Sequence, residues 1–171
     1  MALFVLSVVG SDRPGLTEAL ANAVVSVGGN WLESHLSRLG GLYVGSVLVE
    51  LADNGVEALK AAVSAVDDHG LEVRVAPAVD AAAPAAGEVL QFNLVGQDRP
   101  GIVDQVTAVL TRLGANIETF ATWISAEAYS GAPLFNLEAR LRLPPDRGAS
   151  DVQAALEAIS GEIMVDISLT A

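Results

Sequence analysis

The stretch VVGSDRPGL, residues 8–16, recurs farther along the chain as VGQDRPGI, residues 95–102. A shift of 86 positions superposes the two DRPG sequences, and the match continues without a gap as far as Asn30 and Asn116. An internal repeat of this length predicts two copies of one folding unit, since each copy carries the same sequence of structural signals.

Each copy has the same predicted order of secondary structure. An alternating strand leads into the DRPG loop, and a helix follows with apolar residues recurring at a period near 3.6. Two strands, a second helix and a last strand complete the copy, which is the order of the ferredoxin-like fold. We therefore expect an α+β protein with two βαββαβ domains, each a four-stranded antiparallel sheet with both helices on one face. The expected boundaries are residues 1–76 and 88–171, joined by an Ala/Pro-rich linker over residues 77–87.

The two copies differ in two ways that bear on packing. The second copy is about four residues longer after the second strand, and we align Val47 with Leu137 beyond that insertion. On the outer side of the first strand, Val5 stands where the second copy has Gln91. An apolar residue at that position predicts that the outer face of the first sheet is covered.

The helix ends carry recognisable signals. Pro14 is suited to the first helical turn, and Asp12 to capping the free N–H groups there. Gly28 and its counterpart in the second copy are suited to a left-handed end of the first helix. Ser150 and Gln153 predict a capping box at the start of the last helix.

The arginines of the two loops are not explained by helix geometry. A cation near a helix N-terminus is unfavourable by a few tenths of a kcal/mol, so Arg13 and Arg99 suggest that an anion binds there. The N–H groups of a helix start bind carboxylates, and Asp12 could face an ammonium group. The loop would then be a receptor for an amino acid. The alternative is that DRPG forms a helix start and nothing more.

The sequence pattern GxDRPGL, followed by GxN, resembles the ACT domain, a small regulatory module that binds amino acids. Two such modules without a further domain resemble the family of glycine cleavage system transcriptional repressors, as does YSGAPLFNLEARLRLP in the second copy. The resemblance implies a homodimer, glycine or serine bound near the first loop of a module, and action on a DNA-binding activator protein. The binding residues that it implies are Asp12, Arg13, Pro14, Gly15, Leu16, Asn30, Asp98, Arg99, Pro100, Gly101, Ile102 and Asn116.

Composition limits the other classes of function. The formal net charge of the 171 residues is −12, which opposes direct binding to nucleic acid because the phosphate backbone requires Lys and Arg. No apolar run is long enough to span a membrane, and the lack of Cys is typical of the reducing cytoplasm. His35 and His69 show no metal-ligand spacing. We expect no catalytic constellation, no metal and no cofactor.

We therefore expect a cytoplasmic, amino-acid-responsive regulatory protein that is not an enzyme and acts on a protein partner. A ligand-independent interaction adaptor with the same fold is the alternative. An acyl phosphatase, in which Arg13 would hold phosphate, is a further possibility raised by the same order of elements. Trp31 and Trp123 fit core or sheet-interface positions.

Overall fold

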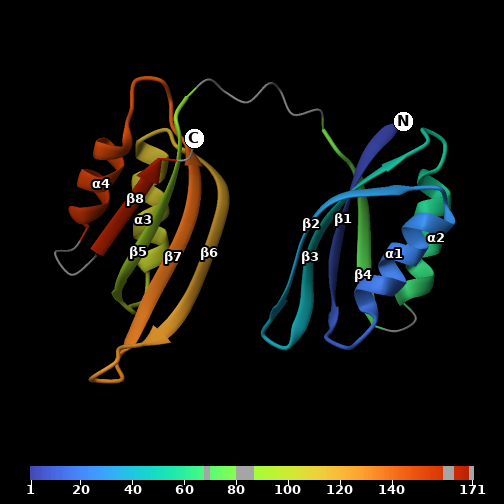
Figure 1. Cartoon of the computed structure of the whole chain (residues 1–171), viewed down its shortest axis with the longest axis horizontal. Coiled ribbons are helices and arrows are strands. Elements are labelled where there is room, and N and C mark those ends of the chain that lie inside the picture. The colour runs from blue at the N-terminus through green and yellow to red at the C-terminus, as the bar shows by residue number, and fades with distance from the viewer. Residues whose placement is uncertain (68–69, 80–86, 160–163, 170–171) are drawn as a thin grey trace. The chain divides into compact units, whose positions relative to one another are not determined.

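The computed structural model divides the chain into two compact units, Met1–Ala81 and Ala82–Ala171 (Figure 1). Of the predicted linker, residues 77–87, the part from 80 to 86 lies outside the described residues. The structure describes residues 1–67, 70–79, 87–159 and 164–169.

The first unit is a four-stranded antiparallel sheet with two helices on one face (Figure 1). Its sheet order is β2-β3-β1-β4, which places the first strand at the centre. The elements are β1 (Ala2–Ser11), α1 (Leu16–Ser26), β2 (Asn30–Leu39), β3 (Leu42–Leu51), α2 (Val56–Asp67) and β4 (Leu71–Pro77).

The second unit repeats this architecture with the sheet order β6-β7-β5-β8. The predicted α+β class and the βαββαβ order in both copies are therefore confirmed. The elements are β5 (Val89–Gln97), α3 (Ile102–Arg112), β6 (Asn116–Ala126), β7 (Pro133–Arg142), α4 (Ala149–Glu157) and β8 (Met164–Leu169).

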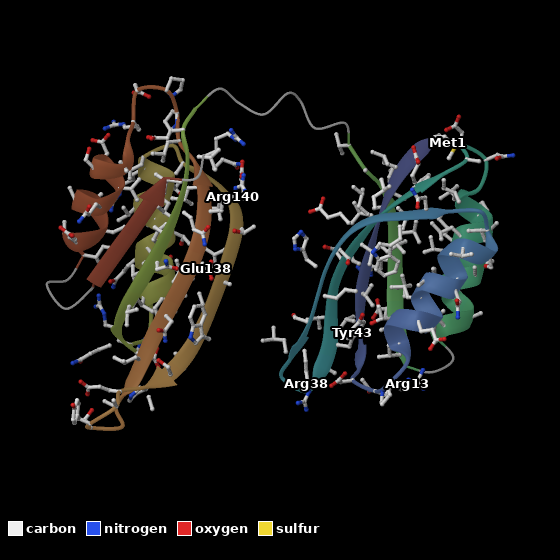
Figure 2. The ribbon with its side chains drawn as sticks, in the orientation of Figure 1. Met1, Arg13, Arg38, Tyr43, Glu138 and Arg140 are labelled. Carbon is white, nitrogen blue, oxygen red and sulfur yellow. The ribbon has the colours of Figure 1, made fainter. Side chains whose placement is uncertain are left out.

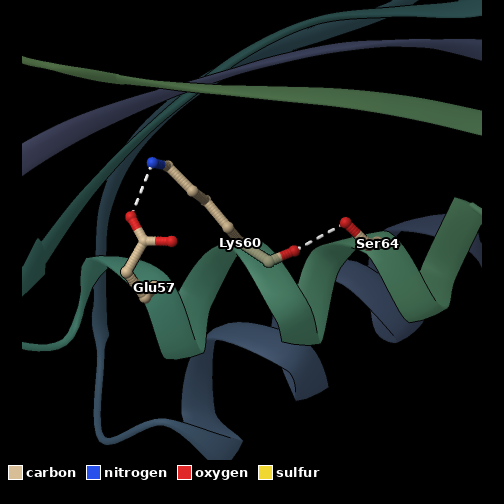
Figure 3. Close-up of polar contacts among 3 residues, drawn as sticks. All are labelled: Glu57, Lys60 and Ser64. Carbon is tan, nitrogen blue, oxygen red and sulfur yellow. Dashed lines mark hydrogen bonds and ion pairs between the residues drawn. The ribbon is translucent and has the colours of Figure 1, made fainter.

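Each unit has its own apolar core between sheet and helices. In the first unit Leu6 of β1 and Leu20 of α1 are fully buried, as the period-2 and period-3.6 patterns predict. The outer face of α2 carries a Glu57–Lys60 ion pair at 2.7 Å, and the Ser64 hydroxyl donates to the Lys60 carbonyl (Figure 3). Because exposed pairs contribute only about 0–1 kcal/mol, burial of the inner face is what holds α2 in place.

Strand register corrects the predicted alignment of the two copies. Gly10 pairs with Tyr43, and its counterpart Gly96 pairs with Phe135, so 33 positions separate the partners in the first unit and 39 in the second. The second copy is thus six residues longer in this region, not four. The counterpart of Val47 is consequently not Leu137 but the residue two positions farther on.

The capping box at the start of the last helix is formed by residues other than the predicted Ser150 and Gln153. The N-cap of α4 is Gly148, two positions before Ser150. The Asp151 carboxylate accepts a hydrogen bond from the Gly148 N–H at 2.9 Å. An acidic residue in the first turn fixes the helix start here because it takes up a free N–H group and complements the helix dipole.

The sheet faces that the helices leave open differ between the units. In the first, Val5 pairs with Leu48, and Val9 with Val44, on the side away from the helices. In the second, Gln91 takes the place of Val5 and donates a hydrogen bond to Glu138. The polar face of the second sheet continues along β7 to Arg140 (Figure 2) and Arg142, which both form ion pairs with Glu118.

Within the described residues, none of the helices has the length and apolar character needed to cross a membrane.

Candidate functional site

The first DRPG loop connects the end of β1 to the start of α1. Pro14 and Gly15 form a turn, and the helix begins at Leu16, so Pro14 lies before the first helical turn and not in it as expected. Gly15 has a φ of +89°, in the left-handed region that favours glycine. A Cβ at Gly15 would meet no atom within 4 Å, so the space beside the helix start is open.

Among the residues that the structure describes, none caps the N-terminus of α1 with its side chain. Asp12, which we expected to cap it, forms an ion pair with Arg38 of β2, with 2.9 Å between its Oδ2 and the arginine Nε. The first N–H groups of α1 are therefore not satisfied by a capping side chain, and the partial positive charge of the helix end is available to a ligand.

Arg13, Arg38 and Tyr43 gather at one end of the first unit (Figure 2). Arg13 is exposed, and its side chain makes no hydrogen bond or ion pair within the described part of the chain. The Tyr43 hydroxyl lies 2.6 Å from Oγ1 of Thr17 in the first turn of α1. The end of the first unit thus presents two guanidiniums, one carboxylate and a pair of hydroxyls.

Sequence reasoning missed Thr17, Arg38 and Tyr43 as members of this cluster. Arg38 and Tyr43 are direct partners across β2 and β3, and Tyr43 pairs with Gly10 across β3 and β1. The signal that could have found them is the Gly-Gly turn at residues 40–41, because it places the end of β2 and the start of β3 at the end of the sheet where β1 ends.

The second loop has the same backbone but different side-chain partners. Gly101 has a φ of +85°, and α3 again begins one residue later, at Ile102. The Arg99 side chain is not free, because its Nη2 donates a hydrogen bond to Oε1 of Gln105 at 2.8 Å. Arg99 lines an open hollow of about 440 Å³ along α3, together with Arg112.

The predicted asparagines lie far from the loops within each unit. Asn30 pairs with Glu50, which pairs with Leu3 at the beginning of β1. The loop follows Ser11 at the other end of β1, roughly 25 Å away at about 3.3 Å per residue. Asn116 lies similarly far from the second loop. It pairs with Arg142, which lies opposite the start of β5, whereas the loop follows Gln97 at the other end of that strand.

The apolar residues among the predicted binding residues pack in the cores of the two units. The Leu16 and Ile102 side chains are both buried, so only their backbone N–H groups face the helix start. Pro14, Pro100, Asp98 and both loop glycines are exposed. Within one unit, the predicted set therefore reduces to the loop itself.

The two tryptophans differ in their surroundings, and one of the two histidines lies among the described residues. Trp31 packs against the core of the first unit, whereas Trp123 on the open face of the second unit is 49% exposed. His35 lies 3.0 Å from Glu33, and His69 falls outside the described residues. No group of three His, Cys, Asp or Glu side chains suited to a metal ion occurs in the described ranges.

Comparisons with known proteins agree with this architecture. A family model for the ACT domain matches residues 2–76. The crystal structure of an unknown protein from Galdieria sulphuraria is similar over 99% of both chains, with 28% identity and a TM-score of 0.83. Comparison with curated proteins gave no match.

A second crystal structure shares the fold at lower identity. It is that of a protein proposed to be a glycine cleavage system transcriptional repressor, and it is 12% identical with a TM-score of 0.70. The similarity covers 99% of this chain and 98% of that chain. The ACT family model thus matches residues 2–76, and because the second unit repeats the topology of the first, both units have the ACT fold.

Proposed function

We propose that this chain is an amino-acid-responsive regulatory protein whose ligand is a small amino acid of the glycine or serine class. The observation that carries the proposal is the free guanidinium of Arg13 beside the uncapped start of α1. Two positive groups at one place are unfavourable unless an anion lies between them. The α-carboxylate of an amino acid supplies that anion.

The geometry of the loop suits the two ends of a zwitterion. The carboxylate would accept hydrogen bonds from Arg13 and from the first N–H groups of α1. Oδ2 of Asp12 already forms the ion pair with Arg38, so Oδ1 is left to face the ammonium group. The open space at Gly15 lets a small ligand approach the backbone.

Regulation would follow from a shift in population between two arrangements of ACT modules. ACT domains typically bind small amino acids and form oligomers, and we propose that this chain acts as a homodimer. A ligand that binds one arrangement more tightly stabilises it and changes the surface offered to a partner. The partner would be a protein, such as a transcription activator of glycine cleavage, because a net charge of −12 opposes contact with DNA. The role includes no catalytic step, and it belongs in the cytoplasm.

A thermal-shift panel of the twenty amino acids, followed by titration calorimetry, tests the proposal. Glycine or serine should raise the melting temperature of the full chain. Arg13→Gln should weaken binding at least tenfold without changing the melting temperature of the free protein. Arg74→Gln is the matched control, because Arg74 is an exposed arginine of the same unit that pairs with Glu72 and not with a residue of the loop. No thermal shift and no heat with any amino acid would refute the proposal.

A second candidate is a ligand-independent interaction adaptor. The observation that favours it is the apolar open face of the first sheet, where Leu3, Val9 and Leu42 remain about 40% exposed. Val9→Lys should then abolish capture of the partner, whereas Arg13→Gln should leave it unchanged, and added amino acids should have no effect. The opposite pattern favours the sensor.

A further inference from the structure

The two DRPG loops share their backbone but not their surroundings. The registers at Gly10 and Gly96 align the strand residues around the loops, and the common helix starts align the first turns. Three polar residues beside the first loop are replaced by apolar ones beside the second. The replacements are Thr17 by Val103, Arg38 by Ile124 and Tyr43 by Phe135.

The replacements change the charge at the loop. Beside the first loop, Arg13 and Arg38 balance Asp12 and Glu18, the acidic residue in the first turn of α1. Beside the second loop, Arg99 stands near the carboxylates of Asp98 and Asp104, and Arg112 of α3 lines the same hollow as Arg99 and Asp104. What distinguishes the first loop is the arginine of the neighbouring strand that pairs with its aspartate, because the second loop has Ile124 at the position of Arg38.

The remaining arginine of the second loop is also engaged elsewhere. Arg99 donates to Gln105, whose counterpart in the first unit is Ala19. An alanine cannot accept such a bond, so Arg13 is left free for a ligand. To bind an anion in the same way, Arg99 would first have to give up its bond to Gln105.

A pair of hydroxyls that could recognise the rest of an amino acid lies beside the first loop and has no counterpart at the aligned positions of the second. The hydroxyls of Thr17 and Tyr43 lie 2.6 Å apart and can both donate and accept. At the corresponding positions, Val103 is 41% exposed and Phe135 is buried. Ile124, where the first unit has Arg38, is 55% exposed. These three side chains offer no hydrogen bond to an ammonium or hydroxyl group.

Resting on the proposed function, we infer that the amino-acid site belongs to the first repeat alone, with one ligand bound per chain. Arg13 holds the carboxylate, Arg38 positions Asp12 for the ammonium group, and Thr17 with Tyr43 meets a polar side chain such as that of serine. The second loop keeps the backbone and the Asp-Arg pair of the repeat, but it lacks the side chains that correspond to Arg38, Thr17 and Tyr43.

The two loops can be observed separately because each contains one exposed glycine amide. The full chain is labelled with ¹⁵N-glycine and titrated with L-serine, and the Gly15 and Gly101 amide signals are followed. We expect the Gly15 signal to shift with saturation and the Gly101 signal to stay in place. Equal shifts of both signals with the same dissociation constant would overturn the inference while leaving the proposed function intact.

Exchanges between the repeats give an independent check. Arg38→Ile installs the counterpart residue and should weaken serine binding at least tenfold, and Arg38→Gln serves as a second variant in case the isoleucine perturbs folding. Arg99→Gln is the matched control and should change affinity less than twofold. A loss of affinity with Arg99→Gln as large as that with Arg13→Gln contradicts the assignment. Failure of the wild-type chain to bind any amino acid refutes the proposed function, and this inference with it.

Discussion

Arg38, near the end of β2, holds Asp12, directly after β1, with 2.9 Å between Nε and Oδ2. The contact fastens the repeated loop to the β2–β3 hairpin, which the sequence separates from it by a whole helix. Because the arginine side chain is 71% exposed, solvent screens the pair. The ion pair therefore positions the Asp12 carboxylate but contributes little to the stability of the fold.

Breaking the Arg38–Asp12 ion pair should therefore destabilise the first unit only slightly. Arg38→Gln is expected to lower the free energy of unfolding of the first unit by less than about 1 kcal/mol, and by less still in 1 M NaCl. Urea unfolding can be followed through Trp31 in a Trp123→Phe background, at low and high salt. A loss above about 2 kcal/mol would make Arg38 a structural residue and remove the basis for its role at the site.

The fold could be predicted from the sequence because repetition and periodicity agree in both copies. The error in aligning the copies has a simple origin. The alignment placed Val47 against Leu137, whereas the register places it against Ala139. A slip of two residues returns every side chain to the same face of the sheet, so the alternating pattern contained no signal against it.

The site could be predicted only in part, for two different reasons. The Gly-Gly turn indicates where the β2–β3 hairpin ends, but the ion pair of Asp12 with Arg38 also depends on side-chain geometry, which the sequence pattern does not specify. The position of Asn30, by contrast, follows from the predicted topology. In a βαβ unit the helix returns the chain to the start of the first strand, so a residue at the beginning of β2 lies far from the loop.

The core of the first unit should respond strongly to truncation. Leu20→Ala removes a fully buried side chain of α1 and should destabilise the unit by about 2–5 kcal/mol through lost burial and a residual cavity. The Trp31-reported urea transition measures this change. Val25→Ala, on the exposed side of the same helix, should change stability by no more than about 0.5 kcal/mol. Equal effects of the two substitutions would contradict the observed face of α1.

The two tryptophans should differ in their access to solvent. Trp123 is half exposed on an open sheet face, whereas Trp31 packs against the core. In single-tryptophan proteins made by Trp31→Phe or Trp123→Phe, acrylamide should quench Trp123 more strongly, and Trp31 should emit at the shorter wavelength. If Trp123 proves the better protected, another surface covers the open face of the second sheet in solution.

The loop glycines are required for their backbone conformation and not for lack of space. Gly15→Ala should cost about 1–2 kcal/mol because an L-residue is strained at a φ of +89°, although a Cβ there has no close neighbour. Asn tolerates this region better, so Gly15→Asn should recover part of the loss. Gly101→Ala should behave as Gly15→Ala does, since its φ is +85°.

Gly10→Ala is the contrasting variant for the loop glycines. A Cβ at Gly10 would collide with the Gly70 carbonyl oxygen and with Leu71, so β1 and β4 would have to separate. Gly10→Ala should destabilise the first unit more than Gly15→Ala does, and an Asn there should bring no recovery because the obstacle is a neighbouring backbone. The urea midpoints of the Ala and Asn variants at Gly10 and Gly15 test these expectations. If Gly15→Ala were neutral while Gly10→Ala remained costly, the left-handed conformation at the DRPG turn would be wrong.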